Sequence, residues 1–168
     1  MERPVKAERP RRLLEARQAQ LAALAEFRYQ LRRFLSFSEN AVEQYQVSAQ
    51  QYQLLQVVAA LPVGQPSTVS YIAERMLLRH NSAVELVDRA ERAGLVRRVE
   101  DRTDHRRSLV ELTESGESRL AWLVRDHLKE LETAGPELLQ TLERAIAINA
   151  STRIEATAKS SSKRRGRA

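Results

Sequence analysis

Apolar residues recur every three or four positions between Gln18 and Gln46, which is the spacing of one face of an α-helix. This stripe consists of Leu24, Phe27, Leu31, Phe34, Ala41 and Tyr45. A second helix is predicted after Ser48, because Ser48 and Gln51 have the spacing of a capping box and an apolar face follows them. Pro62 is expected to end that helix.

A pair of helices with a tight connection is predicted between residues 67 and 94. Ser67 or Thr68 is the expected N-cap of the first helix, which should span about three turns. The second should run from about His80 to Ala93 and stop at Gly94, in the position of a C-terminal glycine cap. Two helices in this order form a helix-turn-helix candidate.

The hydrophobic period changes to that of β-strands after this pair. Residues 95–100 and 108–112 are short aliphatic or β-branched runs, and the charged segment 101–107 separates them. We therefore expect a β-hairpin with a long, charged tip.

The rest of the chain returns to a helical pattern. Thr113 is expected to cap a helix, and the segment 134–136, Ala-Gly-Pro, is expected to break it. A last helix is predicted over 137–158, and the polar, basic residues 159–168 are predicted to be disordered.

These elements predict a mainly α fold with a small β-hairpin wing, that is, a winged helix-turn-helix with additional terminal helices. The apolar stripes of the terminal helices are wider than one small lobe can cover, so they are expected to form a dimerisation region. The expected organisation is a basic arm over 1–17, dimerisation helices over 18–47 and 113–158, a DNA-binding domain over 48–112 and a disordered basic tail over 159–168.

Composition narrows the classes of function. The chain has no cysteine, which excludes disulfides, thiolate nucleophiles and cysteine zinc sites. His80, His105 and His127 are scattered, so we expect no metal site, and no phosphate loop or catalytic motif is present. We therefore expect neither an enzyme nor a cofactor. Because no apolar run resembles a signal peptide or a membrane span, the expected location is the cytoplasm, without membrane contact.

Positive charge is concentrated in particular segments. Of the formal net charge of +6, residues 159–168 contribute +5 and residues 1–17 contribute +3, which leaves −2 for the residues between them. Within that middle part, residues 75–107 nevertheless hold nine arginines and no lysine. Arginine suits contacts with phosphates and narrow minor grooves, because its planar guanidinium donates two hydrogen bonds at once.

The predicted helix 80–93 has one apolar and one polar face. Ala83, Leu86, Val87 and Ala90 fall on one side. Such a helix, supported from behind by its neighbour, fits the major groove of B-form DNA and presents polar side chains to base edges. The candidate DNA-contacting residues are Arg79, His80, Asn81, Ser82, Glu85 and Arg89. The alternative is an ordinary solvated surface helix.

The hairpin tip is the second candidate contact. Its residues would lie beside the recognition helix and reach an adjacent minor groove or the backbone. The candidates are Arg102, Asp104, His105, Arg106 and Arg107. Asp104 is expected to hold Arg106 by an ion pair, and the alternative for the whole segment is a plain charged turn.

Several segments, in order and spacing, resemble the MarR family of bacterial winged-helix regulators over roughly residues 20–150. These are residues 68–75 (TVSYIAER), 82–89 (SAVELVDR), 101–107 (DRTDHRR), and Val110, Leu112, Thr113 and Gly116. The chain departs from the family pattern at Arg79, which occupies what is often a serine helix cap.

The resemblance implies a homodimeric transcriptional regulator, here expected to be a repressor, that binds double-stranded DNA at a pseudo-palindromic operator. It also implies that Ser82 and Glu85 contact bases, that the wing arginines contact the minor groove and that the amide end near Thr68 contacts phosphate.

The resemblance further implies a small aromatic or lipophilic effector. Phe34, Phe37, Tyr45, Tyr52 and Trp122 are candidates for lining its pocket, although aromatic residues on helical stripes also serve as plain core. An alternative function is a protein-interaction adaptor with a degenerate winged helix, which Glu85 and the net negative middle of the chain favour.

Overall fold

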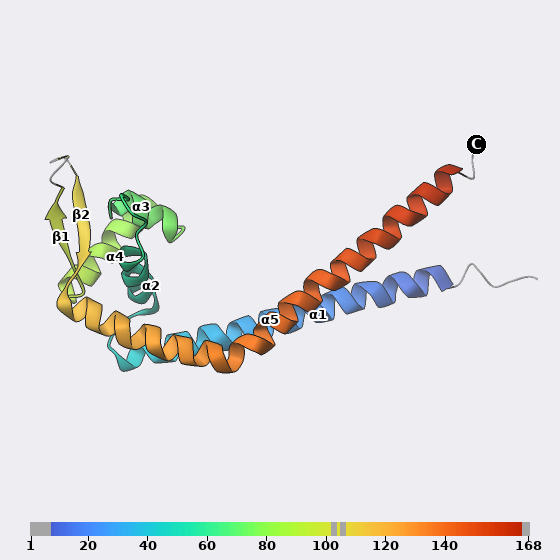
Figure 1. Ribbon diagram of the computed structural model, residues 1–168, viewed down its shortest axis with the longest axis horizontal. Helices are drawn as coiled ribbons and strands as arrows, with labels where there is room; N and C mark the ends of the chain where they lie inside the picture. Colours follow the sequence, from blue (N-terminus) through green and yellow to red (C-terminus); the bar gives the residue numbers. More distant parts are fainter. Residues whose placement is uncertain (1–7, 102–103, 105–106, 166–168) are drawn as a thin grey trace, which may run out of the picture. The chain divides into compact units, whose positions relative to one another are not determined.

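A computed structural model describes residues 8–101, 104 and 107–165 of the chain, with side-chain surroundings over 14–101, 104 and 107–150. The elements in chain order are α1 (Glu8–Gln44), α2 (Ala49–Ala59), α3 (Val69–Arg75), α4 (His80–Arg92), β1 (Val96–Glu100), β2 (Ser108–Leu112) and α5 (Glu114–Arg165) (Figure 1). The chain divides into a terminal-helix unit, residues 1–35 and 130–168, and a winged-helix unit, residues 36–129. The predicted mainly α fold with a two-stranded wing is confirmed.

The core of the winged-helix unit is formed by the apolar faces that the periodicity predicted. Side chains from every helix and strand of the unit meet there, and the largest fully buried ones are Leu54, Leu55, Ile72, Leu86, Leu95 and Leu123. At about 25 cal/mol for each Å² of apolar surface, burial of this kind is the main stabilising contribution to such a small unit.

The helix starts follow the capping chemistry of the sequence. The Ser48 hydroxyl accepts from the Gln51 amide, and the Gln51 side chain accepts from the Ser48 amide, so the predicted capping box is present. The Thr68 side chain accepts from the Tyr71 amide at 3.2 Å, which makes Thr68 the N-cap of α3. With seven residues, α3 spans about two turns rather than the predicted three.

The two strands form an antiparallel hairpin whose register pairs Val96 with Leu112 and Glu100 with Ser108. The Val110 amide donates to the Ser67 carbonyl at 3.0 Å, and an isolated bridge joins Thr68 to Leu109. Strand β2 is therefore tied to the segment that enters α3, and the hairpin lies beside α3 and α4 (Figure 1).

A close backbone approach joins the end of α4 to the start of α5. Gly94 has φ +69° at the end of α4, as its predicted role as a glycine cap requires. The Thr113 hydroxyl donates to the Gly94 carbonyl at 2.6 Å and accepts from the Gly116 amide at 3.0 Å. A Cβ on Gly116 would lie 2.0 Å from the Leu95 carbonyl oxygen, so this position accepts only glycine.

The long helices differ from the sequence prediction. Helix α5 passes through the segment 134–136 without a break; Pro136 has no amide to donate to the Glu132 carbonyl, but the helix continues on both sides. It also continues to Arg165, into the segment predicted to be disordered, where no glycine or proline interrupts it. Helix α1 begins at Glu8, ten residues before the predicted start and within the predicted arm.

In the terminal-helix unit, α1 and α5 are joined by a polar network. The buried Gln30 side chain donates to Glu137 at 2.9 Å, and the Arg33 guanidinium contacts the same carboxylate at 3.3 Å. Large apolar side chains on both helices remain exposed, among them Leu21, Leu24, Leu139, Leu142 and Ile146. Within the part of the chain that the structure describes, no helix is long and apolar enough to span a membrane.

Candidate nucleic-acid interface

Helix α4 has the two faces that the sequence predicted. Ala83, Leu86, Val87 and Ala90 are buried against the core. The candidate contact residues Arg79, His80, Asn81, Ser82, Glu85 and Arg89 are all exposed. The structure thus brings all six to the outer face of one helix or its N-cap.

The start of α4 lacks a side-chain cap. Arg79 is the N-cap residue, and its side chain makes no capping hydrogen bond within the described residues. The first amides of α4 are therefore not satisfied by this residue, which lies at the same end of the helix as Ser82.

Arg89 is the one candidate on α4 for which the structure gives a side-chain contact. Its guanidinium lies 3.4 Å from the side-chain oxygen of Gln50 on α2, a long hydrogen bond at an exposed position. So weak a contact leaves the arginine available to an external acceptor.

Arg107 holds the base of the wing through two acidic partners. Arg107 contacts the buried carboxylate of Asp101 at 3.1 Å and that of Asp104 at 3.2 Å. The Asp101 amide also donates to the Arg107 carbonyl at 3.2 Å. Arg107, predicted as a DNA contact, is therefore engaged within the hairpin.

The other candidates at the tip, Arg102, His105 and Arg106, lie outside the described residues. The expected ion pair between Asp104 and Arg106 lies outside them too. Thr68, the predicted phosphate contact, is half-buried, and its hydroxyl caps α3. Its role toward phosphate stays a prediction.

A cluster that the sequence interpretation missed connects the wing to α4. Arg98 of β1 donates through Nη2 to Asp88 Oδ1 and through Nη1 to Glu91 Oε2, each at 2.5 Å. Its amide donates to Glu91 Oε1 at 2.9 Å. We call Arg98, Asp88 and Glu91 the Arg98 cluster. The backbone and guanidinium hydrogen bonds from Arg98 lower the pKa of Glu91.

The sequence did carry a signal for this cluster. Asp88 and Glu91 are three positions apart on α4, so they lie on the same side of the helix, outside its buried face. An arginine soon after the helix, such as Arg98, was therefore a candidate partner for these two carboxylates. The sequence prediction treated the arginines of this region as DNA contacts instead.

The aromatic candidates for an effector pocket lie in separate groups. Phe37 and Tyr52 contact the ring of the buried His127, with centroids at 5.5 and 4.6 Å. Tyr45 stacks on Trp122 at 5.7 Å and donates its hydroxyl to Asp126 at 2.6 Å. Phe34 belongs to the terminal-helix unit.

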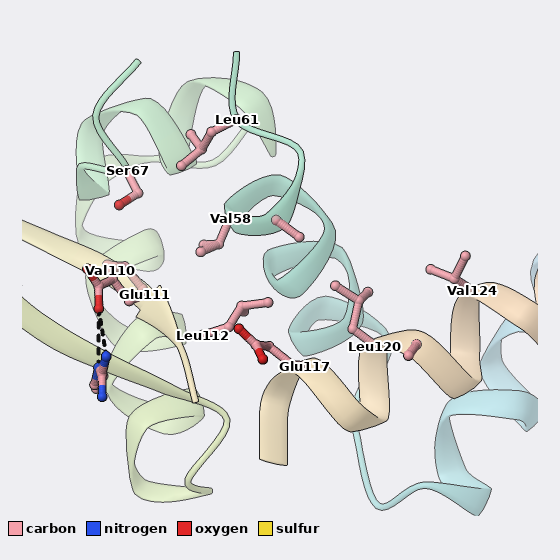
Figure 2. Close-up of a pocket in the computed structure, with 12 residues that line it drawn as sticks. Val58, Leu61, Ser67, Val110, Glu111, Leu112, Glu117, Leu120 and Val124 are labelled. Atoms are coloured by element: carbon pink, nitrogen blue, oxygen red, sulfur yellow. Dashed lines mark hydrogen bonds and ion pairs between the residues drawn. The ribbon is translucent and has the colours of Figure 1, made fainter. Parts of the chain in front are cut away.

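An open groove of about 730 Å³ lies elsewhere in the winged-helix unit, where the end of α2, strand β2 and the start of α5 meet (Figure 2). Val58, Leu112 and Leu120 contribute to its apolar wall. None of the five aromatic candidates is among the described residues that line it. Within the described residues, no group of three or more histidine, aspartate or glutamate side chains has the arrangement of a metal site.

Comparison with known proteins agrees with this geometry. Residues 45–107 match the sequence model of the MarR family. No curated protein matches the sequence.

Several solved structures share the fold. AbsC, a MarR family transcriptional regulator from Streptomyces coelicolor, has 18% identity and a TM-score of 0.63, with 83% of this chain and 94% of that one covered. A MarR family protein from Bacillus stearothermophilus has 24% identity and a TM-score of 0.59, with 83% and 97% covered.

A third is the MepR–DNA complex of S. aureus, with 20% identity, a TM-score of 0.53, and 78% and 97% covered. At these identities the likeness shows a common fold. Together with the family match, which spans α2 to the wing, it identifies residues 45–107 as a winged-helix domain of the MarR family.

Proposed function

We propose that this chain is a homodimeric, sequence-specific DNA-binding transcriptional regulator of MarR type. The observation that carries the proposal is the outer face of α4, where six polar or charged candidates are exposed beside the hairpin in the segment that matches the family. A helix of this kind enters the major groove while the wing contacts the neighbouring minor groove or backbone. The MepR relative was solved as a DNA complex, which supports the same use here.

The exposed apolar surface of the terminal-helix unit supports a dimer. Leu21 is 69% exposed and Ile146 is 62% exposed, and they lie on α1 and α5. Large apolar side chains gathered on two helices are typical of an interface. A two-fold axis would place two α4 helices about 34 to 36 Å apart, one turn of DNA, on a pseudo-palindromic operator.

We also propose how the protein is regulated. It acts as a repressor, and a small aromatic or lipophilic effector releases it from DNA. An effector shifts the protein between two arrangements only if it binds one of them more tightly. Thermal-shift screening of phenolic compounds tests this, with stabilisation of the protein and weaker DNA binding expected together. Phenolics that stabilise nothing and leave DNA binding unchanged would exclude that class of effector.

Selection from a random DNA pool with the full-length protein tests the main proposal. The expected result is a recovered site with two inverted half-sites about 10 base pairs apart, centre to centre. Gel-shift titrations of that site at two salt concentrations should show affinity falling as salt rises, because phosphate contacts release counterions. A pool without enrichment would reject DNA recognition and favour the adaptor function.

A further inference from the structure

The Arg98 cluster contains the closest side-chain contacts that the structure gives between the wing and the recognition helix. The Arg98 side chain is only 28% exposed, and its two Nη atoms each donate to a different carboxylate of α4 at 2.5 Å. Because its amide also donates to Glu91, β1 is joined to α4 through both backbone and side chain.

We propose that Arg98 is a positioning residue that fixes the wing relative to α4, so that both elements meet DNA in a single register. The inference rests on the proposed DNA-binding function. It assigns to Arg98 an indirect effect on sequence specificity, through the position of the wing. Arg98 acts through Asp88 and Glu91 and does not itself contact DNA.

The chemistry of the cluster suits this role. A guanidinium is planar and donates in fixed directions, so binding two carboxylates at once restricts rotation of the strand about the helix. Asp88 and Glu91 are also three positions apart on one helix, where like charges repel each other when no cation lies between them. Arg98 removes that repulsion.

The same hairpin provides a matched control. Arg97 precedes Arg98 and, by the alternation of a strand, points to the opposite face, where its guanidinium lies 2.9 Å from Glu111. That pair joins the two strands to each other and does not reach α4. Arg97 and Arg98 thus both form salt bridges from β1, but only those of Arg98 reach the recognition helix.

The test replaces the carboxylates and keeps the arginine. The double variant Asp88→Asn, Glu91→Gln makes the protein more positive by two charges, so a purely electrostatic effect would strengthen binding to every DNA sequence alike. The measured quantity is the ratio of the affinities for the selected site and for unrelated DNA, at one salt concentration. We expect this ratio to fall at least tenfold, while affinity for unrelated DNA is unchanged or higher.

Hydroxyl-radical footprinting adds an independent readout. Protection of the flanking minor grooves should become weaker or spread over more positions in the double variant, because the wing is no longer held. Glu111→Gln, which also adds one positive charge, should leave both the ratio and the footprint unchanged.

Stability is measured alongside, and Arg98→Lys serves as a second variant if the double variant does not fold. A single ammonium cannot donate to two carboxylates in fixed directions, so Arg98→Lys should also lower the ratio. An unchanged ratio in a folded variant would overturn the positioning role while DNA binding stands. A wild-type protein that selects no site would overturn the proposed function, and this inference with it.

Discussion

Arg107 Nη2 lies 3.1 Å from Oδ2 of Asp101, a carboxylate that is buried at the base of the hairpin. The last arginine of the charged tip is therefore part of the wing's own structure. Arg107 thus binds acidic residues of its own hairpin, whereas the sequence pattern grouped it with the arginines expected to contact DNA.

Removing the buried partner should destabilise the wing. Asp101→Ala leaves the Arg107 guanidinium with Asp104 alone and is expected to lower the free energy of unfolding by about 1–3 kcal/mol, as for a lost buried, charged hydrogen bond. Urea denaturation measures this. A free energy of unfolding equal to that of the wild type would show that the pair contributes nothing.

At two candidate DNA contacts, we expect a substitution to change DNA binding and to leave the stability of the fold unchanged. Arg106→Ala should weaken DNA binding sharply without changing thermal stability, and Ser82→Ala should alter the preferred sequence more than the overall affinity. Gel shifts with the selected site and with single-base variants of it separate these effects. If Arg106→Ala binds as tightly as the wild type, Arg106 makes no important phosphate or minor-groove contact.

The turn between α3 and α4 contains a strained residue. Leu77 has φ +54° and a side chain that is 93% exposed. Its left-handed backbone conformation therefore destabilises the fold, and its side chain contributes little packing in return. Leu77→Gly is expected to leave the free energy of unfolding unchanged or raise it by up to about 1 kcal/mol. Thermal or urea denaturation measures it.

Gly94 provides the matched control, because it has φ +69° and open space around its Cα. Gly94→Ala should lower the free energy of unfolding by about 1 kcal/mol, through backbone strain alone. A marked loss of stability in Leu77→Gly would mean that the leucine side chain makes a stabilising contact after all.

The sequence predicted most of the winged-helix unit because its signals are local. The Ser48–Gln51 capping box, the Thr68 cap and Gly94 each act within a few residues, and each is where the pattern placed it. Helix α5 was misjudged at Pro136 because helix continuation depends on the turns on either side, which the breaker rule ignores.

The candidate site was predicted less completely. Helical periodicity predicted that the six candidate residues of α4 and its N-cap would be exposed, and the structure places them so; their contact with DNA stays a prediction. The partners of Arg98 and Arg107 depend on tertiary contacts across ten and six residues, where several acidic groups compete. Composition cannot distinguish an arginine that binds its own chain from one that faces outward.

Glu91 makes the stability of the protein depend on pH. Hydrogen bonds from Arg98 lower the pKa of Glu91 in the folded protein, so its stabilising contribution is complete above its ordinary pKa and is lost as pH falls through the lowered one. The difference in urea midpoint between the wild type and Glu91→Gln should therefore be largest near neutral pH and shrink below about pH 4. A difference that stays constant with pH would show that the ionised carboxylate is not what stabilises the fold.

The exposed apolar side chains of α1 and α5 give the last prediction. Ile146 is 62% exposed and Leu139 is 56% exposed, so a charge at either position has little to disturb within one chain. In a dimer that buries them, a glutamate would lose its hydration without a partner. Ile146→Glu and Leu139→Glu should therefore sediment as folded monomers at concentrations where the wild type is a dimer.

The control is Val63→Glu, because Val63 is fully exposed and lies outside both terminal helices. It should remain a dimer. The monomeric variants should also lose preference for a two-half-site operator over a single half-site, since that preference requires both recognition helices on one duplex. If Ile146→Glu and Leu139→Glu both remain dimeric, the interface lies elsewhere on the chain.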